Sequence, residues 1–398
     1  MEVGIVGKPN VGKSTFFRAA TLAEAEVANY PFTTIKANVG VGYTRAPCPH
    51  TELGTPCSPR NSECAEGIRL VPMRMIDVAG LVPGASEGKG LGNQFLDDLR
   101  QASVLIHVVD ASGTTDIEGK ACDEHDPCED VRFLEEEIVA WFANILKKSW
   151  TRFSRRVQFE HLKFEVVVAE QFTGLGVNED HVRQALRLSG VDAEKPAQWS
   201  DDDIHTFCSA LRAIAKPIII AANKADNPKA AENLEVLKKT FPDTLVVPTC
   251  AEAELALRNA ARGGVVDYVP GAEDFKINED AKLNDKQRHG LELIRDRVIR
   301  PLKGTGIQKV LDTAVKDLLK LIVVYPVEDE NKWADGKGNV LPDAYLVPQG
   351  ITARQLAYRI HTDIGEKFVC AVDGRSKRRM GESHVLDDGA VISIMAKK

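Results

Sequence analysis

Short apolar runs recur along the chain, and each is followed by a polar or glycine-rich motif. The runs cover residues 3–6, 104–109, 217–222 and 245–248. Apolar runs of this length, bounded by turn residues, are typical of buried parallel strands. Helical segments separate them, so we predict an α/β protein with a doubly wound, mostly parallel sheet. Ligands of such sheets bind beyond the carboxyl ends of the strands, where these motifs lie.

A charged stretch at residues 113–214 interrupts this strand pattern. Its apolar positions recur at helical spacing in segments 130–148, 180–188 and 202–214. The sheet does not need this stretch, so we predict a helical domain inserted into the sheet domain.

The rest of the chain divides around that insertion. The sheet domain is predicted to comprise residues 1–112 and 215–275, and a helical linker to cover 276–320. The tail, residues 321–398, alternates short strands with glycine turns and contains one helix that Thr352 is expected to cap. We therefore expect a small, strand-rich domain at the C-terminus.

The first apolar run leads into Gly7-Lys8-Pro9-Asn10-Val11-Gly12-Lys13-Ser14, which matches the phosphate-binding P-loop pattern in full. The glycines let backbone N–H groups turn towards a β-phosphate, and a helix beginning near Lys13 points its positive end at the same phosphates. Lys13 is expected to bridge the β- and γ-phosphates, and the Ser14 hydroxyl to bind Mg²⁺. The alternative, a chance glycine turn, is disfavoured by the strand before it and the helix after it. The expected nucleotide contacts are Gly7, Pro9, Asn10, Val11, Gly12, Lys13, Ser14 and Thr15.

An acidic motif, Asp77-Val78-Ala79-Gly80, ends the apolar run at residues 71–76. An acid at a strand end beside a P-loop holds Mg²⁺ through water, and the N–H of the following glycine binds a γ-phosphate. We expect Asp77 to hold Mg²⁺ through water and the Gly80 N–H to bind the γ-phosphate.

The motif Asn223-Lys224-Ala225-Asp226 follows the run at 217–222. A carboxylate at Asp226 accepts two hydrogen bonds from guanine N1–H and its exocyclic amine, and adenine offers neither, so adenine is rejected. The stem of Lys224 can lie along the base. Helix capping is the alternative role for Asn223 or Asp226. Thr249-Cys250-Ala251, after the next strand, is expected to give a backbone N–H to the guanine oxygen.

A nucleotide-sensing loop is expected at Tyr30-Pro31-Phe32-Thr33-Thr34, between the P-loop helix and the acidic motif. A threonine there completes the Mg²⁺ shell only when the γ-phosphate is present. We choose Thr34, with Thr33 as the second choice. The alternative is that the pair merely starts the next strand.

Composition narrows the functional classes. A net charge of −7 argues against a protein that coats nucleic acid by bulk charge, although a local basic patch remains compatible with it. No apolar run reaches the length of a membrane span, and the N-terminus lacks a signal-peptide pattern, so we expect a cytoplasmic protein and no membrane partner.

The 8 cysteines are expected to be reduced in that compartment. Cys48, Cys57 and Cys64 share one stretch with His50, and Cys122 and Cys128 share another with His125. None has the paired Cys-x-x-Cys spacing of a zinc knuckle, so free thiols are favoured over a metal site.

Two basic segments are candidates for contact with RNA. Residues 147–156, from Lys147 to Arg156, interleave five basic residues with Trp150 and Phe153. The favoured interpretation is a solvated helix face with both rings turned inward. The second segment is the tail cluster of Arg375, Lys377, Arg378 and Arg379.

Three nucleotide-site segments together resemble the Obg superfamily of GTPases. They are Gly7 to Thr15 with Pro9 and Asn10, Tyr30 to Thr34, and Asp77 to Gly92 (DVAGLVPGASEGKGLG). The helical insertion and the tail are similar to the YchF-like branch.

The tail carries a second resemblance. Its segments Tyr325-Pro326-Val327, Asp373-Gly374 and Asp388-Gly389-Ala390 resemble a TGS domain, a ubiquitin-like β-grasp module. The resemblance to Obg-like proteins and TGS domains implies a switch protein that associates with the ribosome or with translation factors. We expect a monomer.

The resemblance also bears on the choice of nucleotide. Bacterial and eukaryotic YchF-like proteins lack the guanine-specifying aspartate and favour ATP, whereas this chain keeps Asp226 and resembles the archaeal type. We therefore predict GTP and GDP as ligands, with Mg²⁺. An ATPase and a nucleotide-stabilised scaffold for RNA or protein with negligible turnover remain the alternatives.

The catalytic apparatus is expected to differ from that of Ras-like enzymes. Leu81 stands where those enzymes place a water-orienting glutamine, and an aliphatic side chain cannot orient water. Lys13, Thr34 and Gly80 are the expected catalytic contributors, together with Asn10, which stands where potassium-activated relatives hold K⁺. A purely structural Asn10 that braces the loop at residues 30–34 is the alternative. The glycine-rich stretch at residues 84–92 is expected to be a second switch loop.

Overall fold

The computed structural model describes residues 2–21, 38–78, 92–160 and 162–397. Contacts divide the chain into two compact units. The first comprises Met1–Leu22, Ala37–Gly40 and Arg74–Val310. Of the described residues, the second comprises Val41–Met73 and the chain from Leu311 onward. The sequence did not suggest that residues 41–73 belong with the C-terminal part of the chain.

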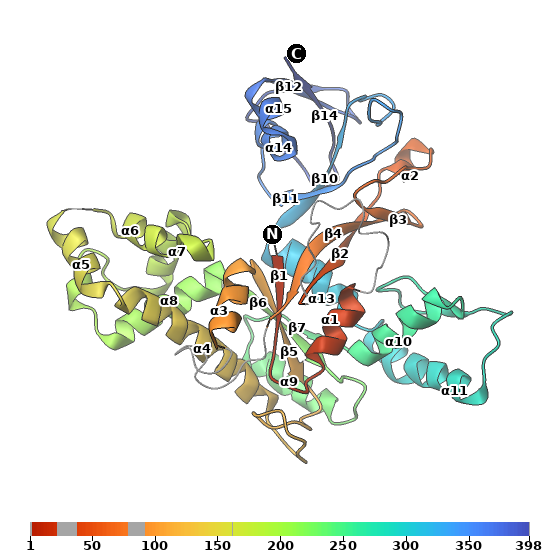
Figure 1. Cartoon of the computed structure of the whole chain (residues 1–398), viewed down its shortest axis with the longest axis horizontal. Helices are drawn as coiled ribbons and strands as arrows, with labels where there is room; N and C mark the ends of the chain where they lie inside the picture. The colour runs from red at the N-terminus through yellow and green to blue at the C-terminus, as the bar shows by residue number, and fades with distance from the viewer. Residues whose placement is uncertain (1, 22–37, 79–91, 161, 398) are drawn as a thin grey trace. The chain divides into compact units, whose positions relative to one another are not determined.

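A predominantly parallel sheet runs through the first unit and also includes residues of 41–73, which the contacts assign to the second unit (Figure 1). Its strand order is β2-β4-β1-β5-β6-β7, and β3 pairs with β4. The strands are β1 (Glu2–Val6), β2 (Val39–Pro47), β3 (Glu63–Ala65), β4 (Ile68–Asp77), β5 (Val104–Asp110), β6 (Ile218–Asn223) and β7 (Val246–Pro248). The pairs β1–β4, β1–β5, β5–β6 and β6–β7 are parallel, whereas β3–β4 is antiparallel. The expected α/β class with a mostly parallel sheet is confirmed.

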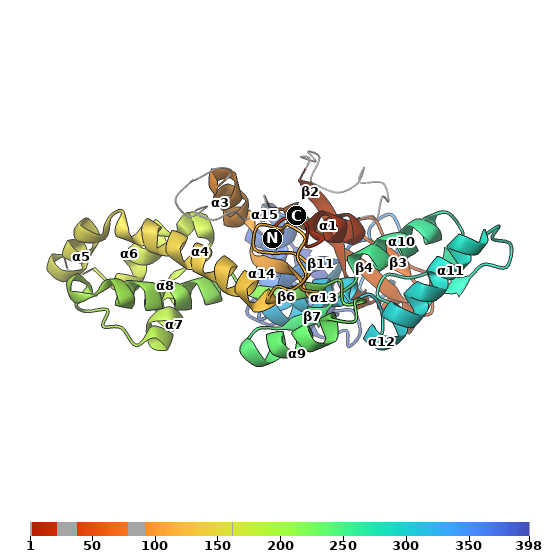
Figure 2. The ribbon, with the colours of Figure 1, turned by 90° about the horizontal axis from the view of Figure 1, so that it is seen from below.

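The central strands of the sheet are buried, which accounts for their apolar sequences. Every residue of β5 and of β6 is buried, as expected for central strands covered on both faces. The covering helices are α1 (Lys13–Thr21), α3 (Gly92–Gln101), α9 (Ala230–Thr240) and α10 (Ala251–Arg262). Figures 1 and 2 show the sheet between α3 on one side and α1 with α10 on the other. The connections therefore wind over both faces, and they deliver the loops after β1, β4, β6 and β7 to one edge.

Helices fill the chain between β5 and β6, where the insertion is predicted. They are α4 (Pro127–Lys147), α5 (Trp150–Phe159), α6 (Phe164–Gln171), α7 (Glu179–Ser189) and α8 (Asp201–Ala215), with 3-10 turns at Thr173–Leu175 and Pro196–Gln198. Asp126 caps α4, and Ser200 forms a capping box with Asp203 at the start of α8. Phe164 and Phe207 lie edge-on to each other at 5.5 Å in the buried core of these helices. The predicted limits of this insertion as a domain stay a prediction.

The remainder of the first unit follows β7. A short antiparallel pair, β8 (Val266–Asp267) and β9 (Lys276–Ile277), precedes α11 (Asp285–Ile294). A π-helical turn at Arg295–Ile299 and α12 (Arg300–Leu302) lead to α13 (Ile307–Thr313). The helical linker that the sequence predicts is thus largely helical.

The second unit contains a sheet of order β11-β10-β14-β12-β13. Its elements are a π-helical turn at Ala314–Leu318, β10 (Leu321–Val327), β11 (Tyr345–Pro348), α14 (Ala353–Ile360), α15 (Thr362–Glu366), β12 (Phe368–Asp373), β13 (Arg379–Met380) and β14 (Val391–Ala396). The central pair β10–β14 is parallel and its neighbours are antiparallel, which is the β-grasp arrangement. Thr352 caps α14 in a capping box with Gln355, as expected.

Residues 41–73 belong to the core of this second unit. The hydroxyl of the buried Tyr325 donates to the carbonyl oxygen of Pro47 at 2.9 Å, and the Asp312 carboxylate accepts from the Thr44 hydroxyl at 3.0 Å. This part of the chain also contains α2 (His50–Leu53). Within the described ranges, no helix of either unit has the length and apolarity needed to cross a membrane.

Candidate nucleotide-binding site

The P-loop joins β1 to α1, and its backbone requires glycine at two positions. Gly7 and Gly12 have φ values of 156° and 93°, in the region that side chains rarely adopt. A Cβ atom on Gly7 would lie 2.6 Å from the Val108 carbonyl oxygen, and one on Gly12 would clash with the Asn223 amide. The helix begins at Lys13, as the sequence predicts, so its free N–H groups face the loop.

Lys13 and Asp77 meet although 64 residues separate them. The Lys13 ammonium contacts the Asp77 carboxylate and donates to the Val78 carbonyl oxygen at 2.9 Å. The pairing of β1 with β4, which sets Ile5 beside Asp77, brings the two together. Ser14, one residue beyond Lys13, has an exposed side chain. A carboxylate and a hydroxyl offer the oxygen ligands that Mg²⁺ prefers, and the ammonium offers a positive charge for phosphate oxygens.

Asn223 connects three motifs through one buried amide group. Its Nδ2 donates to the Val11 carbonyl oxygen at 2.9 Å, inside the P-loop. Its Oδ1 accepts from the Ala251 N–H at 3.0 Å and from the Thr249 hydroxyl at 3.4 Å. The structure therefore places Asn223 as a link between the P-loop and the loop that follows β7.

Lys224, which follows Asn223, forms an ion pair with Asp110. The Lys224 ammonium donates to Asp110 Oδ2 at 2.8 Å, and its backbone adopts a φ of 60°. Burial raises the pKa of Asp110, but hydrogen bonds from Lys224, Ser112 and Thr115 outweigh it, so the pKa stays below its ordinary value. The Lys224 head group is thereby held in place and its half-exposed stem is available to a flat ligand.

Asp226 lies exposed at the end of this motif, with its carboxylate oriented by a thiol. The Cys250 Sγ lies 3.2 Å from Asp226 Oδ1. Burial raises the pKa of Cys250 to about 12, so the thiol stays protonated and donates to the carboxylate. The sequence suggested only a backbone role for Cys250, because no spacing pattern reveals a side-chain contact of this kind.

A buried ion pair, which the sequence did not indicate, anchors the P-loop residue Lys8 to α4. Lys8 and Asp130 are both almost fully buried, and the Lys8 ammonium lies 2.9 Å from Asp130 Oδ1. His125 Nε2 lies 2.9 Å from the same oxygen. The Asn10 amide donates to the Gly119 carbonyl oxygen at 2.8 Å. Asn10 thus braces the loop after β5. The loop at residues 30–34, which its structural alternative named, lies outside the described residues.

Several expected site residues lie outside the described residues. They are Thr33, Thr34, Gly80 and Leu81, with the glycine-rich stretch up to Gly90. Their roles therefore stay predictions. Of the expected site residues, the structure brings together the P-loop, Asp77, Asn223, Lys224, Asp226 and the segment Thr249–Ala251.

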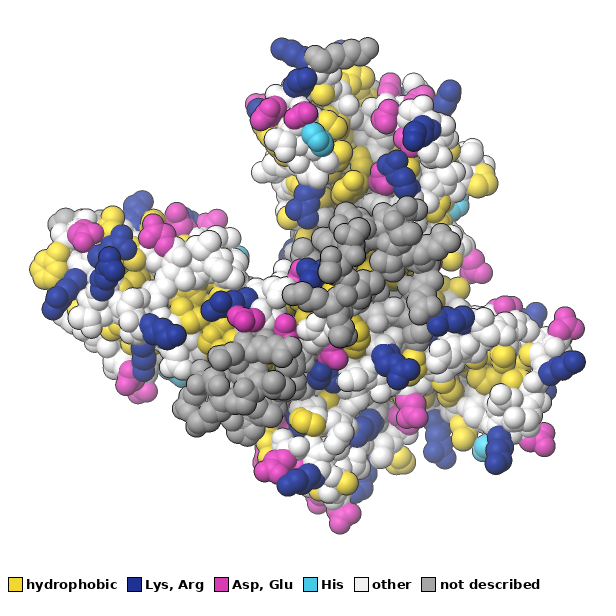
Figure 3. All heavy atoms as spheres, in the orientation of Figure 1, with side chains coloured by type: hydrophobic (Ala, Val, Ile, Leu, Met, Phe, Trp, Pro, Cys, Tyr) yellow, Lys and Arg dark blue, Asp and Glu magenta, His cyan; other side chains and the backbone are white. Residues whose placement is uncertain are grey.

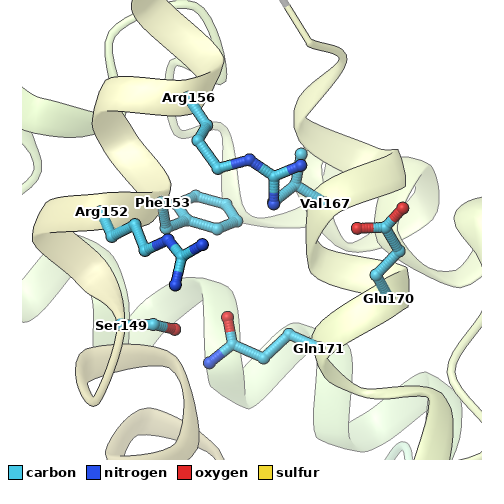
Figure 4. Close-up of a pocket in the computed structure, with 7 residues that line it drawn as sticks. All are labelled: Ser149, Arg152, Phe153, Arg156, Val167, Glu170 and Gln171. Atoms are coloured by element: carbon cyan, nitrogen blue, oxygen red, sulfur yellow. The ribbon is translucent and has the colours of Figure 1, made fainter.

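The aromatic residues of the first basic segment are turned inward. Phe153 is 2% exposed, and Trp150 stacks on it at a centroid distance of 5.2 Å. Arg152 and Arg156 line a pocket of about 330 Å³, with Gln171 and Glu170 across from them (Figure 4). Because the rings pack inside the insertion, Trp150 and Phe153 are not available to stack on RNA bases.

The basic cluster of the tail is partly engaged within its own unit. Arg375 forms a two-point ion pair with Glu52, at 2.6 and 2.7 Å, and Lys377 Nζ donates to the Gly374 carbonyl oxygen at 2.6 Å. Arg378 and Arg379 are exposed. On the face seen in Figure 3, basic and acidic side chains are interspersed, in keeping with the modest net charge.

Comparison with known proteins identifies the family. Family models match residues 2–139 (50S ribosome-binding GTPase), 221–329 (Obg-like GTPase YGR210-like, G4 motif-containing domain) and 337–396 (TGS domain). The chain is 50% identical over 394 residues to a GTP-binding protein of Methanocaldococcus jannaschii, covering 99% of this chain and 98% of that one. The chain belongs to the YchF-like branch of the Obg-like GTPases.

More distant YchF-like relatives also align along nearly the whole chain. The ribosome-binding ATPase YchF of Escherichia coli O157:H7 is 28% identical over 428 residues, covering 99% of this chain and 98% of that protein. The crystal structure of a GTP-binding protein from Pyrococcus horikoshii OT3 matches with a TM-score of 0.80 and 42% identity, covering 100% of both chains. The expected family and the TGS domain are confirmed.

The link made by Asn223 gives a prediction for this YchF-like chain. Asn223→Ala leaves the Val11 carbonyl oxygen and the Ala251 N–H without their partner, so both loops lose their anchor. A lost buried hydrogen bond costs roughly 1–3 kcal/mol, so we expect affinity for a fluorescent guanosine diphosphate to fall about tenfold or more. Fluorescence titration measures this affinity.

The matched control is Asn233→Ala, which removes another amide bond to a backbone carbonyl, that of Ala111 at 2.8 Å. Asn233 does not contact the P-loop, so this variant should keep its nucleotide affinity. An equal loss of affinity in the two variants would contradict the assigned role of Asn223.

Proposed function

We propose that this protein binds GTP with Mg²⁺ and hydrolyses it to GDP and phosphate, and that it acts as a nucleotide-dependent switch. The observation that carries the proposal is the position of Asp226, an exposed carboxylate held by Cys250 beside a motif that Asn223 ties to the P-loop. One residue, Asn223, thus couples the place for a base to the place for phosphates.

Base selection follows from the chemistry of that carboxylate. Guanine presents an N1–H and an amine on the same edge, and both donate to a carboxylate. Adenine presents a lone pair at N1, so its binding leaves the carboxylate unpaired and desolvated, at a cost of several kcal/mol. Several YchF-like relatives carry the name ATPase. Asp226 favours GTP over that alternative for this chain.

The phosphate side of the site fits a Mg²⁺-bound triphosphate. Mg²⁺ prefers hard oxygen ligands, and Ser14 with Asp77 supplies a hydroxyl and a carboxylate; Thr34 is the proposed third protein ligand. Bound Mg²⁺ neutralises charge on the β- and γ-phosphate oxygens. Lys13 provides a fixed positive charge for the same oxygens, and Gly80 is proposed to donate its N–H to the γ-phosphate.

Hydrolysis in this site has to proceed without a water-orienting glutamine, because Leu81 occupies that position. Slow turnover by the chain alone follows from this substitution. We propose that K⁺ accelerates it at Asn10, whose amide nitrogen donates to Gly119 and whose amide oxygen is the atom that a cation would contact. The scaffold alternative, with negligible turnover, rests on Leu81 as well.

Base selection is tested by Asp226→Asn. The amide replaces one acceptor by a donor, so we expect GTP affinity to fall by at least about a hundredfold. Xanthosine triphosphate carries an oxygen in place of the guanine amine, so its relative affinity should rise. Competition titrations of GTP, ATP and xanthosine triphosphate measure these changes.

Asp243→Asn is the control, since Asp243 is an exposed acid in the turn after α9 and lies outside the site motifs. It should leave all three affinities unchanged. Wild-type protein without preference for GTP over ATP, or Asp226→Asn with an unchanged preference, would overturn the proposed specificity.

Cation dependence tests the hydrolytic step. Removal of Mg²⁺ by a chelator should abolish single-turnover hydrolysis, because Lys13 alone leaves much of the phosphate charge uncompensated. Replacement of NaCl by KCl at equal ionic strength should raise the rate about tenfold or more, within the range that one added charge-stabilising contact supplies. Equal rates in the two salts would remove K⁺ from the proposal while leaving the Mg²⁺ step intact.

We further propose that the switch acts on the ribosome in the cytoplasm. The support is the ribosome-binding name of the YchF relatives, the ribosome-binding GTPase family model and the TGS domain. Within the tail cluster, Arg378 and Arg379 are the proposed RNA contacts, because Arg375 and Lys377 already bond within their own unit.

Sedimentation with ribosomal subunits tests this association. We expect the monomeric protein to pellet with subunits when loaded with a non-hydrolysable GTP analogue and to remain largely in the supernatant with GDP, because a switch loop orders only around the γ-phosphate. Binding that is independent of the nucleotide, or absent in both states, would contradict the switch.

A further inference from the structure

Three cysteines and a histidine converge in the second unit, and none of them belongs to the nucleotide motifs. The chain leaves β2 at Pro47, forms α2, and returns through β3. Along this excursion, Cys48, His50, Cys57 and Cys64 each present one ligand atom, and the four atoms all lie within 4.8 Å of one another. The sequence favoured free thiols here, because the spacing lacks tight cysteine pairs.

The distances within this group match one tetrahedral ion. Cys48 Sγ lies 3.9 Å from Cys57 Sγ, and Cys64 Sγ lies 3.6 Å from His50 Nδ1. Bond lengths of about 2.3 Å for Zn–S and about 2.0 Å for Zn–N in a tetrahedron give edges of about 3.8 Å for S–S and about 3.5 Å for S–N. A disulfide needs sulfurs about 2.05 Å apart, so these cysteines are present as separate thiols.

Backbone contacts hold the ligands where they are. The hairpin of β3 and β4 sets Cys64 opposite Arg69, and the Cys48 N–H donates to the Gly67 carbonyl oxygen at 2.8 Å. The segment after Cys57 is fixed by the Ser58 N–H, which donates to the Val340 carbonyl oxygen at 2.8 Å. The cluster is therefore built by long-range contacts, which explains why its sequence spacing is irregular.

The buried Arg69 is a second, independent indication that the cysteine–histidine group carries a negative charge. It is fully buried, and its guanidinium donates to Cys48 Sγ at 3.3 Å and to the Leu341 carbonyl oxygen at 2.9 Å. Among the described residues, no carboxylate forms an ion pair with Arg69. A buried cation is costly without a negative partner. Three thiolates and a neutral imidazole around Zn²⁺ carry a net charge of −1, which balances this guanidinium.

We propose that Cys48, His50, Cys57 and Cys64 form a structural Zn²⁺ site. Soft thiolates with one imidazole in a tetrahedral group suit zinc, and a full set of four protein ligands leaves no position for a substrate. Metal binding releases the three thiol protons to solvent. The sulfurs pack in the same core as Tyr325, Trp333 and Leu341, so the ion fastens residues 48–64 to the strands of the second unit.

The test begins with the full-length protein, purified without a metal-affinity tag or chelator. Elemental analysis should find about one zinc per chain, and Co²⁺ exchanged into the site should show thiolate charge-transfer and tetrahedral ligand-field bands. Cys64→Ser should bring the zinc content close to zero. Cys370→Ser is the matched control, since Cys370 is a half-exposed thiol of the same unit outside the cluster; it should retain the metal.

Two further measurements keep the test decisive if Cys64→Ser fails to fold. His50→Cys preserves a four-ligand set and should keep the zinc while shifting the Co²⁺ spectrum. Stripping zinc from the wild-type protein should lower its thermal unfolding temperature, and added Zn²⁺ should restore it. Metal-free protein that takes up no Zn²⁺, a Cys48–Cys57 disulfide, bound iron instead of zinc, or equal zinc in Cys64→Ser and Cys370→Ser would each overturn the proposal.

Discussion

The nucleotide site depends on one buried amide, the side chain of Asn223. It joins the P-loop carbonyl of Val11 to the Thr249–Ala251 segment, so segments more than two hundred residues apart share one hydrogen-bond network. A buried amide is stable only when both its nitrogen and its oxygen are bonded, and here each has a partner. The P-loop and the Thr249–Ala251 segment are therefore positioned relative to each other by the protein itself.

The sequence was sufficient for the fold class, and it predicts the candidate site residues, because these features are local. A P-loop is a contiguous pattern, buried strands are short apolar runs, and the Thr352 cap lies within three residues of its partner Gln355. Asp77 is predicted because it ends a strand, and Asp226 because its motif follows one, and parallel strands deliver their carboxyl ends to one edge.

The features that the sequence could not reveal arise from contacts between distant residues. Lys8 pairs with Asp130 across 122 positions, and the Cys250 thiol orients Asp226 with no spacing rule to announce it. The convergence of Cys57 and Cys64 depends likewise on a hairpin and on the C-terminal strands. In each case the partner is chosen by tertiary packing, which periodicity does not encode.

The close approach of Gly12 to the Asn223 amide has a steric consequence. Any side chain at position 12 would displace that amide, and the amide also supports the Thr249–Ala251 segment. A change at Asp226 leaves both of these contacts of the Asn223 amide in place. Glycine at position 12 and asparagine at position 223 therefore constrain each other sterically, whereas position 226 is free of that constraint.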